Sequence, residues 1–247
     1  MSCLVDYHCH LDLYPDFENL IDECEKNQIY TLAVTTTPKA FPRNYSLMSN
    51  KKYVRAALGL HPQLVASRAS EIEIWKEYFT QTRYIGEIGL DAGTQFYKSF
   101  ELQKEIFKTI LEFCSRAGNK ILSIHSVRSV KIVLDMIEKY STHKTNGIVL
   151  HWFSGEAPHL QKAIELGCYF SINSQMLKNT KSQSLIKQIP INRLLTETDG
   201  PFSLTGTTTS RPINSKETII LLADLLKRNY DNTSEAIFSN MQHLETK

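Results

Sequence analysis

The chain has 247 residues, of which 42% are hydrophobic and 22% are charged, so its composition excludes a disordered, collagen-like or disulfide-stapled protein. Its 28 Lys and Arg nearly balance its 26 Asp and Glu, and the net charge of +2 creates no global field that would attract nucleic acid. Any polyanion would therefore have to be bound through a local patch or a metal ion.

Five widely spaced cysteines form no Cys-x-x-Cys pair, which predicts reduced thiols in a cytoplasmic protein. They are Cys3, Cys9, Cys24, Cys114 and Cys168. We also expect no secretory signal and no membrane span, because the first residues lack a basic region and no apolar run reaches about 18 residues.

Short apolar runs rich in Val, Ile, Leu and Tyr predict eight buried strands that alternate with amphipathic helices. The strands are expected at residues 3–7, 29–35, 53–59, 84–88, 120–124, 147–150, 168–172 and 193–196. The helices are expected at residues 16–26, 96–117, 127–140, 158–166, 181–188, 215–228 and 234–244. The polar run TGTTTS at 205–210 is expected to be a loop.

Eight units in 247 residues give about 31 residues each, which is the size of a βαβ unit. A doubly wound sheet would carry a Gly-rich phosphate turn after its first strand, but here His8, Cys9 and His10 follow that strand. We therefore predict an α/β fold, a (β/α)₈ TIM barrel, as a single domain over residues 1–247.

Seven side chains that can bind metals or protons stand at or just beyond the ends of predicted strands. They are His8, His10, His61, Glu87, His125, His151 and Asp199. Parallel strands of a barrel end at one rim, so these residues are expected to converge there. Each has a plainer explanation alone, such as a hydrogen-bonded core His or an Asp-Gly turn, but together they predict a metal site. Glu87 is the most informative, since a carboxylate in an apolar strand needs a partner or a ligand.

Mixed imidazole and carboxylate ligands suit Zn²⁺, Mg²⁺ or Mn²⁺. Six candidate ligands exceed the needs of one tetrahedral ion, so we expect two divalent metal ions bridged by a carboxylate. Such a pair favours displacement at phosphorus or hydrolysis of an acyl centre.

Six motifs occur in a fixed order along nearly the whole chain. They are D-x-H-x-H-L-D at 6–12, G-L-H-P at 59–62, G-E-I-G-L-D at 86–91, I-H-x-x-R at 124–128, H-x-F-S-G at 151–155 and L-L-T-E-T-D-G-P-F at 194–202. In these motifs the chain resembles the TatD family of metal-dependent deoxyribonucleases, within the amidohydrolase-like barrels. The resemblance implies hydrolysis of phosphodiester bonds in DNA, either single-stranded or at DNA ends, by a water that two metal ions activate.

The resemblance also implies a role for each residue. Glu87 would bridge two ions, Asp199 would bind one ion and meet the attacking water, and His61 would contact the scissile phosphate instead of a metal. These three are the predicted catalytic residues. The remaining ligands would be His8 and His10 at the first ion, with Asp199, and His125 and His151 at the second.

Four further residues are implied to support the site. Arg128 and Arg211 would contact phosphate, while Asp91 and Glu197 would orient the ligating imidazoles. A salt bridge at the barrel rim is the plainer alternative for the two carboxylates.

The chain departs from the family pattern in loops that face the substrate. Gln63 replaces a frequent second His, Ser129 an acidic residue and Trp152 a Cys, and Pro212 lies in a segment expected to read R-N-E-P. We expect Trp152 to pack beneath the rim, with base stacking as the alternative. Lys178, Lys181 and Lys187 are expected on a solvated helix face, with a nucleic-acid path as the alternative.

This compact, diverged chain is similar to the TatD-like subunits of bacterial anti-phage operons. A role in antiviral defence and protein partners from the same operon are therefore expected. Two alternatives remain open, namely a weakly catalytic or non-catalytic metal-bound subunit and an amidohydrolase-type hydrolase of a small substrate. Many relatives in that superfamily bridge their metals with a carboxylated Lys at strand four, so Glu87 at this place favours the nuclease branch.

Overall fold

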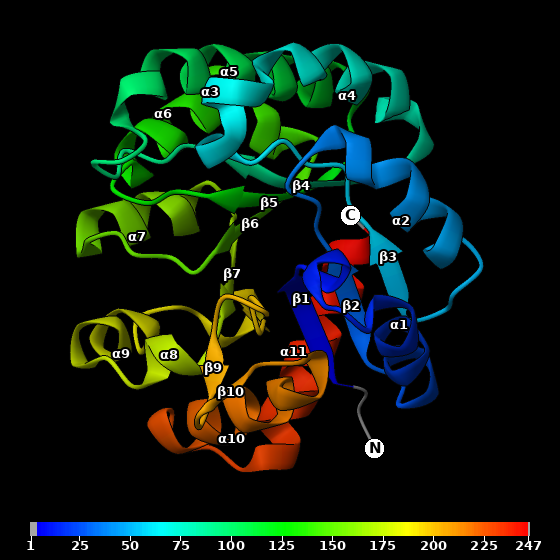
Figure 1. Cartoon of the computed structure of the whole chain (residues 1–247). Coiled ribbons are helices and arrows are strands. Elements are labelled where there is room, and N and C mark those ends of the chain that lie inside the picture. The colour runs from blue at the N-terminus through cyan, green and yellow to red at the C-terminus, as the bar shows by residue number, and fades with distance from the viewer. Residues whose placement is uncertain (1–3, 247) are drawn as a thin grey trace.

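Eight strands curve round a common axis, with the helices outside them (Figure 1). The structure is a computed structural model, and it describes residues 4–246. The strands are β1 (Val5–Cys9), β2 (Tyr30–Ala33), β3 (Val54–Ala56), β4 (Tyr84–Gly89), β5 (Ile121–His125), β6 (Gly147–His151), β7 (Tyr169–Ile172) and β8 (Leu194–Thr196). Strands β1 to β3 and strands β4 to β8 pair in parallel and in chain order, which is the topology of a (β/α)₈ barrel.

Two irregular junctions close the ring. After β3, Leu58 pairs in parallel with Ile85 of β4, and its N–H donates to the Tyr84 carbonyl at 3.0 Å. Between β8 and β1, the buried carboxylate of Asp6 accepts hydrogen bonds from the N–H of Thr198 at 2.8 Å and from its hydroxyl at 2.5 Å. A side chain thus replaces part of the backbone ladder at this junction.

The helices of the outer layer follow the strands in chain order. They are α1 (Phe17–Lys26), α2 (Phe41–Met48), α3 (Val65–Arg68), α4 (Ile72–Tyr78), α5 (Phe100–Ala117), α6 (Val130–Lys139), α7 (Ala157–Glu165), α8 (Ser174–Leu177), α9 (Thr180–Ile186), α10 (Ser215–Leu225) and α11 (Tyr230–Thr246). In α5, buried residues recur every three or four positions, and Gly118 ends the helix with a φ of +64°.

The strands are buried on both faces. Every residue of β1, β5 and β6 is buried, because helices cover the outside of the barrel and side chains fill its inside. The end of α11 lies against the barrel through Glu245, whose two carboxylate oxygens accept hydrogen bonds from Tyr7 and Tyr84, each at 2.6 Å. Tyr84 begins β4, so this contact lies at the amino-terminal end of that strand, away from the rim where the strands end.

Several predicted boundaries are wrong. The first strand runs over Val5–Cys9, so His8 lies inside it, and residue 3 of the predicted range lies outside the described residues. Helix α5 begins at Phe100, because residues 97–99 form a 3₁₀ turn, and α11 begins four residues early at Tyr230. The expected loop at 205–210 holds a small hairpin of β9 (Leu204–Thr205) and β10 (Thr208–Thr209).

Helices α2, α3, α4 and α8 have no counterpart in the sequence prediction. They are four to eight residues long, α2 carries a Pro in its first turn, and 3₁₀ turns flank α3 and α4. Such short pieces show too few turns for a helical period to stand out.

The four described cysteines are buried and form no disulfide with one another, and Cys3 lies outside the described residues. Within residues 4–246, no helix combines the length and the apolar character that crossing a bilayer requires.

Candidate metal centre

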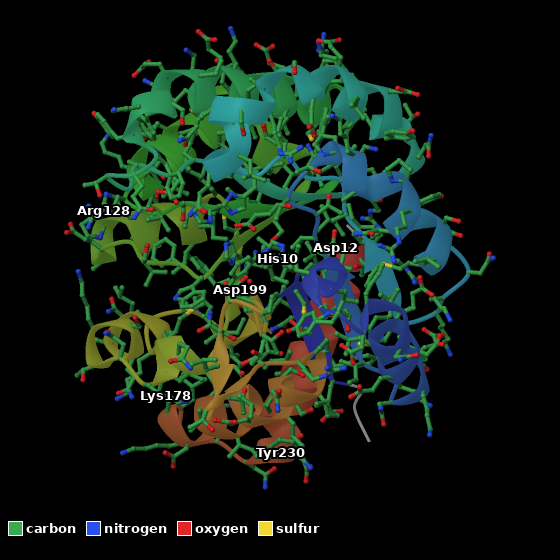
Figure 2. The ribbon with its side chains drawn as sticks, viewed as in Figure 1. His10, Asp12, Arg128, Lys178, Asp199 and Tyr230 are labelled. Atoms are coloured by element: carbon green, nitrogen blue, oxygen red, sulfur yellow. The ribbon has the colours of Figure 1, made fainter. Side chains whose placement is uncertain are left out.

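Six predicted ligands meet at the rim where the strands end. His8 lies in β1 and Glu87 in β4, while His125 and His151 are the last residues of β5 and β6. The other two, His10 and Asp199, lie just beyond β1 and β8 and face the middle of the barrel (Figure 2). All six are between 0% and 7% exposed, so the rim encloses a polar cluster shielded from bulk water.

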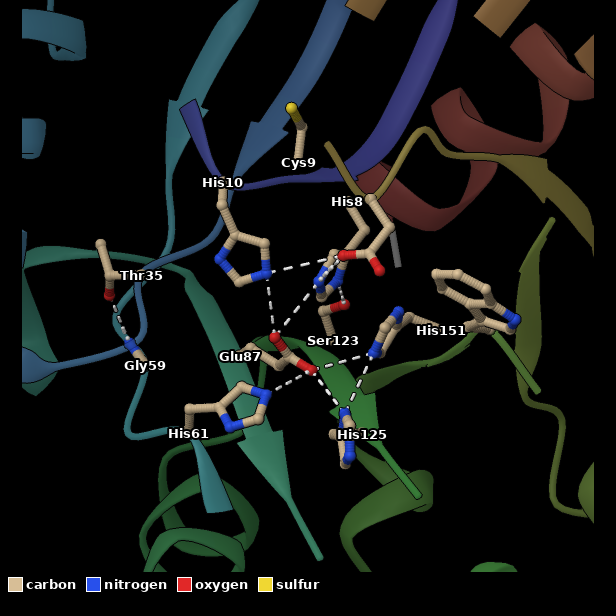
Figure 3. Close-up of polar contacts among 12 residues, drawn as sticks. His8, Cys9, His10, Thr35, Gly59, His61, Glu87, Ser123, His125 and His151 are labelled. Atoms are coloured by element: carbon tan, nitrogen blue, oxygen red, sulfur yellow. Dashed lines mark hydrogen bonds and ion pairs between the residues drawn. The ribbon is translucent and has the colours of Figure 1, made fainter. Parts of the chain in front are cut away.

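Glu87 stands at the centre of this cluster (Figure 3). Its Oε2 faces the first strand, 3.4 Å from His8 Nε2 and 3.1 Å from His10 Nε2. Its Oε1 lies 2.8 Å from His125 Nδ1 and 2.9 Å from His151 Nε2. The two oxygens of one carboxylate therefore divide the imidazoles into two sets, as a carboxylate that bridges two ions does.

A second carboxylate completes the first set. Asp199 Oδ1 lies 3.6 Å from the Nε2 atoms of both His8 and His10. Three groups of residues could each hold an ion, because the donor atoms within each group lie within 4.8 Å of one another. The groups are His8, His10 and Glu87; His8, His151 and Asp199; and His61, Glu87 and His125.

The ring of His8 is prepared to bind a cation. Its Nδ1 is 2.7 Å from the Ser123 hydroxyl, and when Nδ1–H donates there, Nε2 keeps a free lone pair. Among the described residues, the buried Nε2 has no hydrogen-bond partner, although it faces Glu87 and Asp199. A lone pair aimed at two carboxylates fits a divalent ion between them, so the residues present suit the implied metal.

The charges of the cluster also call for a cation. Burial raises the pKa of Asp199 to about 7, since its charge is costly without a counter-ion, and His151 and His10 offset this only in part. Burial also opposes a charge on His151, yet Glu87 and Glu197 outweigh it and raise the pKa of this imidazole well above its usual value. The carboxylates thus draw positive charge to the rim, and a bound ion would supply it.

His61 carries its proton on a different ring nitrogen from His8. It follows β3, and its Nδ1 accepts a hydrogen bond from the N–H of Gln63 at 3.1 Å. In the neutral ring the proton is then on Nε2, which lies 3.2 Å from Glu87 Oε1. Burial lowers the pKa of His61 and favours this neutral form. In this neutral form its Nε2–H is set to donate a hydrogen bond.

Gly59 allows the chain after β3 to approach Glu87. A Cβ at this position would lie 1.9 Å from the Thr35 carbonyl oxygen and 2.4 Å from the Glu87 nitrogen, closer than any real contact. The Gly59 N–H donates to the Thr35 hydroxyl at 2.9 Å (Figure 3). The glycine of the G-L-H-P motif is thus required by the space beside Glu87.

The two carboxylates expected to orient imidazoles lie against the predicted ligands. Asp91 Oδ2 is 3.0 Å from His125 Nε2 and accepts a hydrogen bond from the Gln63 amide at 2.8 Å. Burial would raise the pKa of Asp91, but these hydrogen bonds outweigh it and lower that pKa to about 2. Glu197 Oε1 is 3.7 Å from His151 Nδ1.

Glu197 is held by three donors. Its carboxylate accepts hydrogen bonds from the Ser171 hydroxyl, the Asn173 amide and the Trp152 N–H. Sequence reasoning missed Ser171 and Asn173, and it also missed Ser123 beside His8. Ser123 precedes His125 by two residues in β5, so the two side chains share one face of the strand, and this alternation is the signal that could have found it.

The two predicted phosphate contacts lie away from the cluster. Arg128 is exposed in the loop after β5 and lies at the periphery of the molecule (Figure 2). Arg211 pairs with Asp16 at 2.7 Å and with Glu23 at 3.4 Å, so its guanidinium is already engaged. Lys178 is exposed and lies 3.9 Å from Glu217, also far out from the rim (Figure 2).

A pocket of about 660 Å³ opens above the cluster, within the size range of small-ligand sites. Polar residues at its floor include His10, His61 and Asp199, while its walls are largely apolar. The apolar residues that line it are Leu13, Leu64, Val127, Trp152 and Phe202. In the part of the chain that the structure describes, no Lys or Arg lines it.

A (β/α)₈ barrel with imidazoles and carboxylates gathered at the carboxyl rim of its strands has the architecture of a metal-dependent hydrolase. The sequence matches the family described as TatD related DNase over residues 5–246, so the chain belongs to this family. The family resemblance seen in the motifs is thereby confirmed.

Proteins similar to this chain are named as a deoxyribonuclease, a metal-dependent hydrolase, a TatD homolog or an amidohydrolase. The human deoxyribonuclease TATDN3 is 25% identical over 217 residues, which cover 80% of this chain and 78% of that protein. YjjV of Escherichia coli, named an uncharacterized metal-dependent hydrolase, is 25% identical over 97% of both chains. The crystal structure of YjjV, a TatD homolog, superposes over all of both chains with a TM-score of 0.88. An uncharacterized amidohydrolase from Saccharomyces cerevisiae has a TM-score of 0.81 at 16% identity and shares the fold. The predicted (β/α)₈ barrel is thus confirmed.

Proposed function

We propose that this metal-dependent hydrolase is a deoxyribonuclease that hydrolyses phosphodiester bonds of DNA at a centre of two divalent ions. The observation that carries the proposal is the placement of Glu87, whose two oxygens each face a separate set of imidazoles. Membership in the TatD related DNase family and the naming of the human relative as a deoxyribonuclease support DNA as the substrate.

The ligands divide between two positions. His8, His10 and Asp199 would hold one ion, His125 and His151 would hold the other, and Glu87 would bridge them. Bound there, the ions would polarise the phosphate and lower the pKa of a water molecule so that it can attack phosphorus. Zn²⁺, Mg²⁺ and Mn²⁺ all suit this mixed set of donors.

The protein's own side chains would handle protons and orientation. Asp199 is the carboxylate at the mouth of the cluster and would accept the proton of the attacking water. The Nε2–H of His61 would donate a hydrogen bond to a phosphate oxygen and stabilise the charge that develops there. Asp91 would hold His125 in register through a hydrogen bond, and Glu197, 3.7 Å from His151 Nδ1, would face the ring of His151 and favour its orientation.

The proposal is tested by metal analysis and a nuclease assay on the same preparation. Purified protein should bind two divalent ions and cleave an end-labelled single-stranded oligonucleotide, and Glu87→Gln should lose both bound metal and cleavage. Glu165→Gln, on exposed α7, is the matched control and should change neither. Metal-loaded protein that leaves single-stranded and duplex DNA intact would refute the proposal.

A second candidate is the hydrolysis of a small ester or amide. The specific observation in its favour is the apolar pocket without Lys or Arg among its described lining residues. Turnover of chromogenic esters or amides by protein that cleaves no DNA would favour it. A cytoplasmic location, antiviral defence and operon partners stay predictions from the sequence.

A further inference from the structure

Trp152 occupies a fixed position beside the metal centre. It directly follows His151 and takes up a left-handed backbone conformation with a φ of +40°. Its backbone N–H donates a hydrogen bond to Glu197 Oε1 at 3.2 Å. That same oxygen lies 3.7 Å from His151 Nδ1, so one carboxylate positions both residues. The Trp152 side chain packs partly against the core and also lines the pocket.

A second aromatic ring lines the same pocket. Phe202 lies three residues beyond Asp199, and its N–H donates to the Asp199 carbonyl at 2.9 Å. The ring is 62% exposed, and it stands edge-on to His10 with centroids 5.1 Å apart. Because the ring lines the pocket and most of it is open to solvent, its surface is accessible to a ligand there.

The pocket lacks the charges that would follow a phosphate backbone. Neither predicted phosphate-binding arginine is placed to supply them. Arg211 pairs with Asp16 and Glu23, and Arg128 lies exposed at the periphery (Figure 2). A nucleic acid at this site would therefore be recognised at one or a few nucleotides, chiefly through its bases.

We propose that Trp152 and Phe202 stack on the base of an unpaired nucleotide whose phosphate lies at the metal centre. The inference rests on the proposed function and adds the feature of DNA that the pocket selects. Every base offers an aromatic face, so such stacking tolerates any sequence, whereas a paired base keeps its faces covered in the duplex. Because Trp152 stands where the family motif carries Cys, the contact made by this ring is a feature of this chain.

Intrinsic fluorescence reports on the contact without any need for turnover. The chain has two tryptophans, and Trp75 is fully buried, so a ligand in the pocket reaches Trp152 alone. Metal-loaded protein is titrated with a short phosphorothioate oligothymidylate, which resists hydrolysis, and with the same backbone carrying tetrahydrofuran residues in place of nucleosides. The thymidylate should quench the fluorescence and the abasic strand should not, while Trp152→Phe should abolish the quenching.

The affinity of each variant for the thymidylate and for the abasic strand is then measured in a competition binding assay. Trp152→Ala and Phe202→Ala should each weaken binding of the thymidylate by roughly 5- to 150-fold and leave the abasic strand unchanged. Leu204→Ala is the matched control, since Leu204 is 47% exposed two residues beyond Phe202 but does not line the pocket. Melting temperatures of all variants show whether each one is folded.

Equal affinity of the wild-type protein for the two probes would overturn the inference, as would an equal loss for both probes in the alanine variants. The proposed function fails separately. Base-dependent quenching with no cleavage of an ordinary oligonucleotide would support the stacking site and refute the nuclease. Cleavage of ordinary and abasic strands at the same rate would support the nuclease and refute the stacking site.

Discussion

His8 and His61 differ in the partner of the ring nitrogen that faces away from Glu87. Ser123 leaves a lone pair on His8 Nε2, whereas the Gln63 N–H leaves a proton on His61 Nε2. One hydroxyl and one backbone amide thus separate an imidazole with a free lone pair from one that donates a hydrogen bond. Two predictions for single residues follow, one for His61 and one for Asp199.

His61→Ala should keep both metal ions and lose turnover by roughly 10²–10³-fold, since the variant removes a hydrogen-bond donor to the developing phosphate charge and no ligand. Elemental analysis and single-turnover cleavage of an oligonucleotide measure the two effects. His243→Ala, on the exposed side of α11, serves as the control. Loss of an ion from the His61 variant would make this residue a ligand and contradict the assignment.

Asp199→Asn should fold normally and lose cleavage by roughly 10²–10⁴-fold, because an amide neither carries the charge nor accepts the proton. The residue has a φ of +51°, which Asn tolerates as well as Asp, so its backbone hydrogen bonds to His8 and Phe202 should persist. Thermal melting, metal content and cleavage are compared with Asp135→Asn, a surface variant. An active Asp199→Asn protein would reduce this residue to a turn position.

At the scale of elements, the strands are held together by side chains where backbone pairing is incomplete. The Asp6 carboxylate joins β1 to the segment after β8 through Thr198. Glu245 connects the C-terminal helix α11 to β1 and β4, because its carboxylate accepts hydrogen bonds from a tyrosine hydroxyl of each strand. The last helix is therefore part of the barrel, not an appendage to it.

Glu245→Ala should destabilise the fold and spare the chemistry. Two partly buried tyrosine hydroxyls would lose a charged acceptor, which costs about 1–3 kcal/mol of unfolding free energy. Urea denaturation measures the loss, and kcat should stay at the wild-type value because this contact lies away from the metal rim. Glu235→Ala, exposed on the same helix, is the control. A variant of normal stability would show that α11 docks by its apolar contacts alone.

At the scale of the whole molecule, positive and negative charges nearly balance, and many charged side chains form ion pairs. The net charge is +2, and long-range pairs such as Arg211–Asp16 leave little positive field near the pocket. Under the two proposals made above, recognition of a polyanion would depend on the metal centre and on stacking, both of which act over short distances.

Binding of single-stranded DNA should consequently depend weakly on salt. With about two phosphates neutralised, the logarithm of the affinity should fall with the logarithm of NaCl concentration with a slope of about −1.4 or shallower. Fluorescence polarisation over a range of NaCl concentrations gives the slope, and a neutral osmolyte separates ionic from osmotic effects. A slope of about −4 would reveal a phosphate-tracking surface and contradict the short-range recognition proposed here.

The sequence by itself determined the barrel and the residues gathered at its rim. Buried strands show in short apolar runs, and a carboxylate such as Glu87 in one of them marks a site, because local burial and polarity are written residue by residue. The rule that parallel strands end at one rim then brought His8 and Asp199 together without any knowledge of distances.

Only the tertiary structure decided how those residues are used. Ser123 facing His8, Asp91 shared by His125 and Gln63, and the pairing of Arg211 with Asp16 at a separation of 195 residues all depend on neighbours distant in the chain. Such pairings leave no local pattern, because a hydrogen bond is formed by two side chains whose proximity is set by the packing of the whole barrel. The proton on His61 Nε2, the engagement of Arg211 away from the pocket and the apolar walls around Trp152 follow from that packing alone.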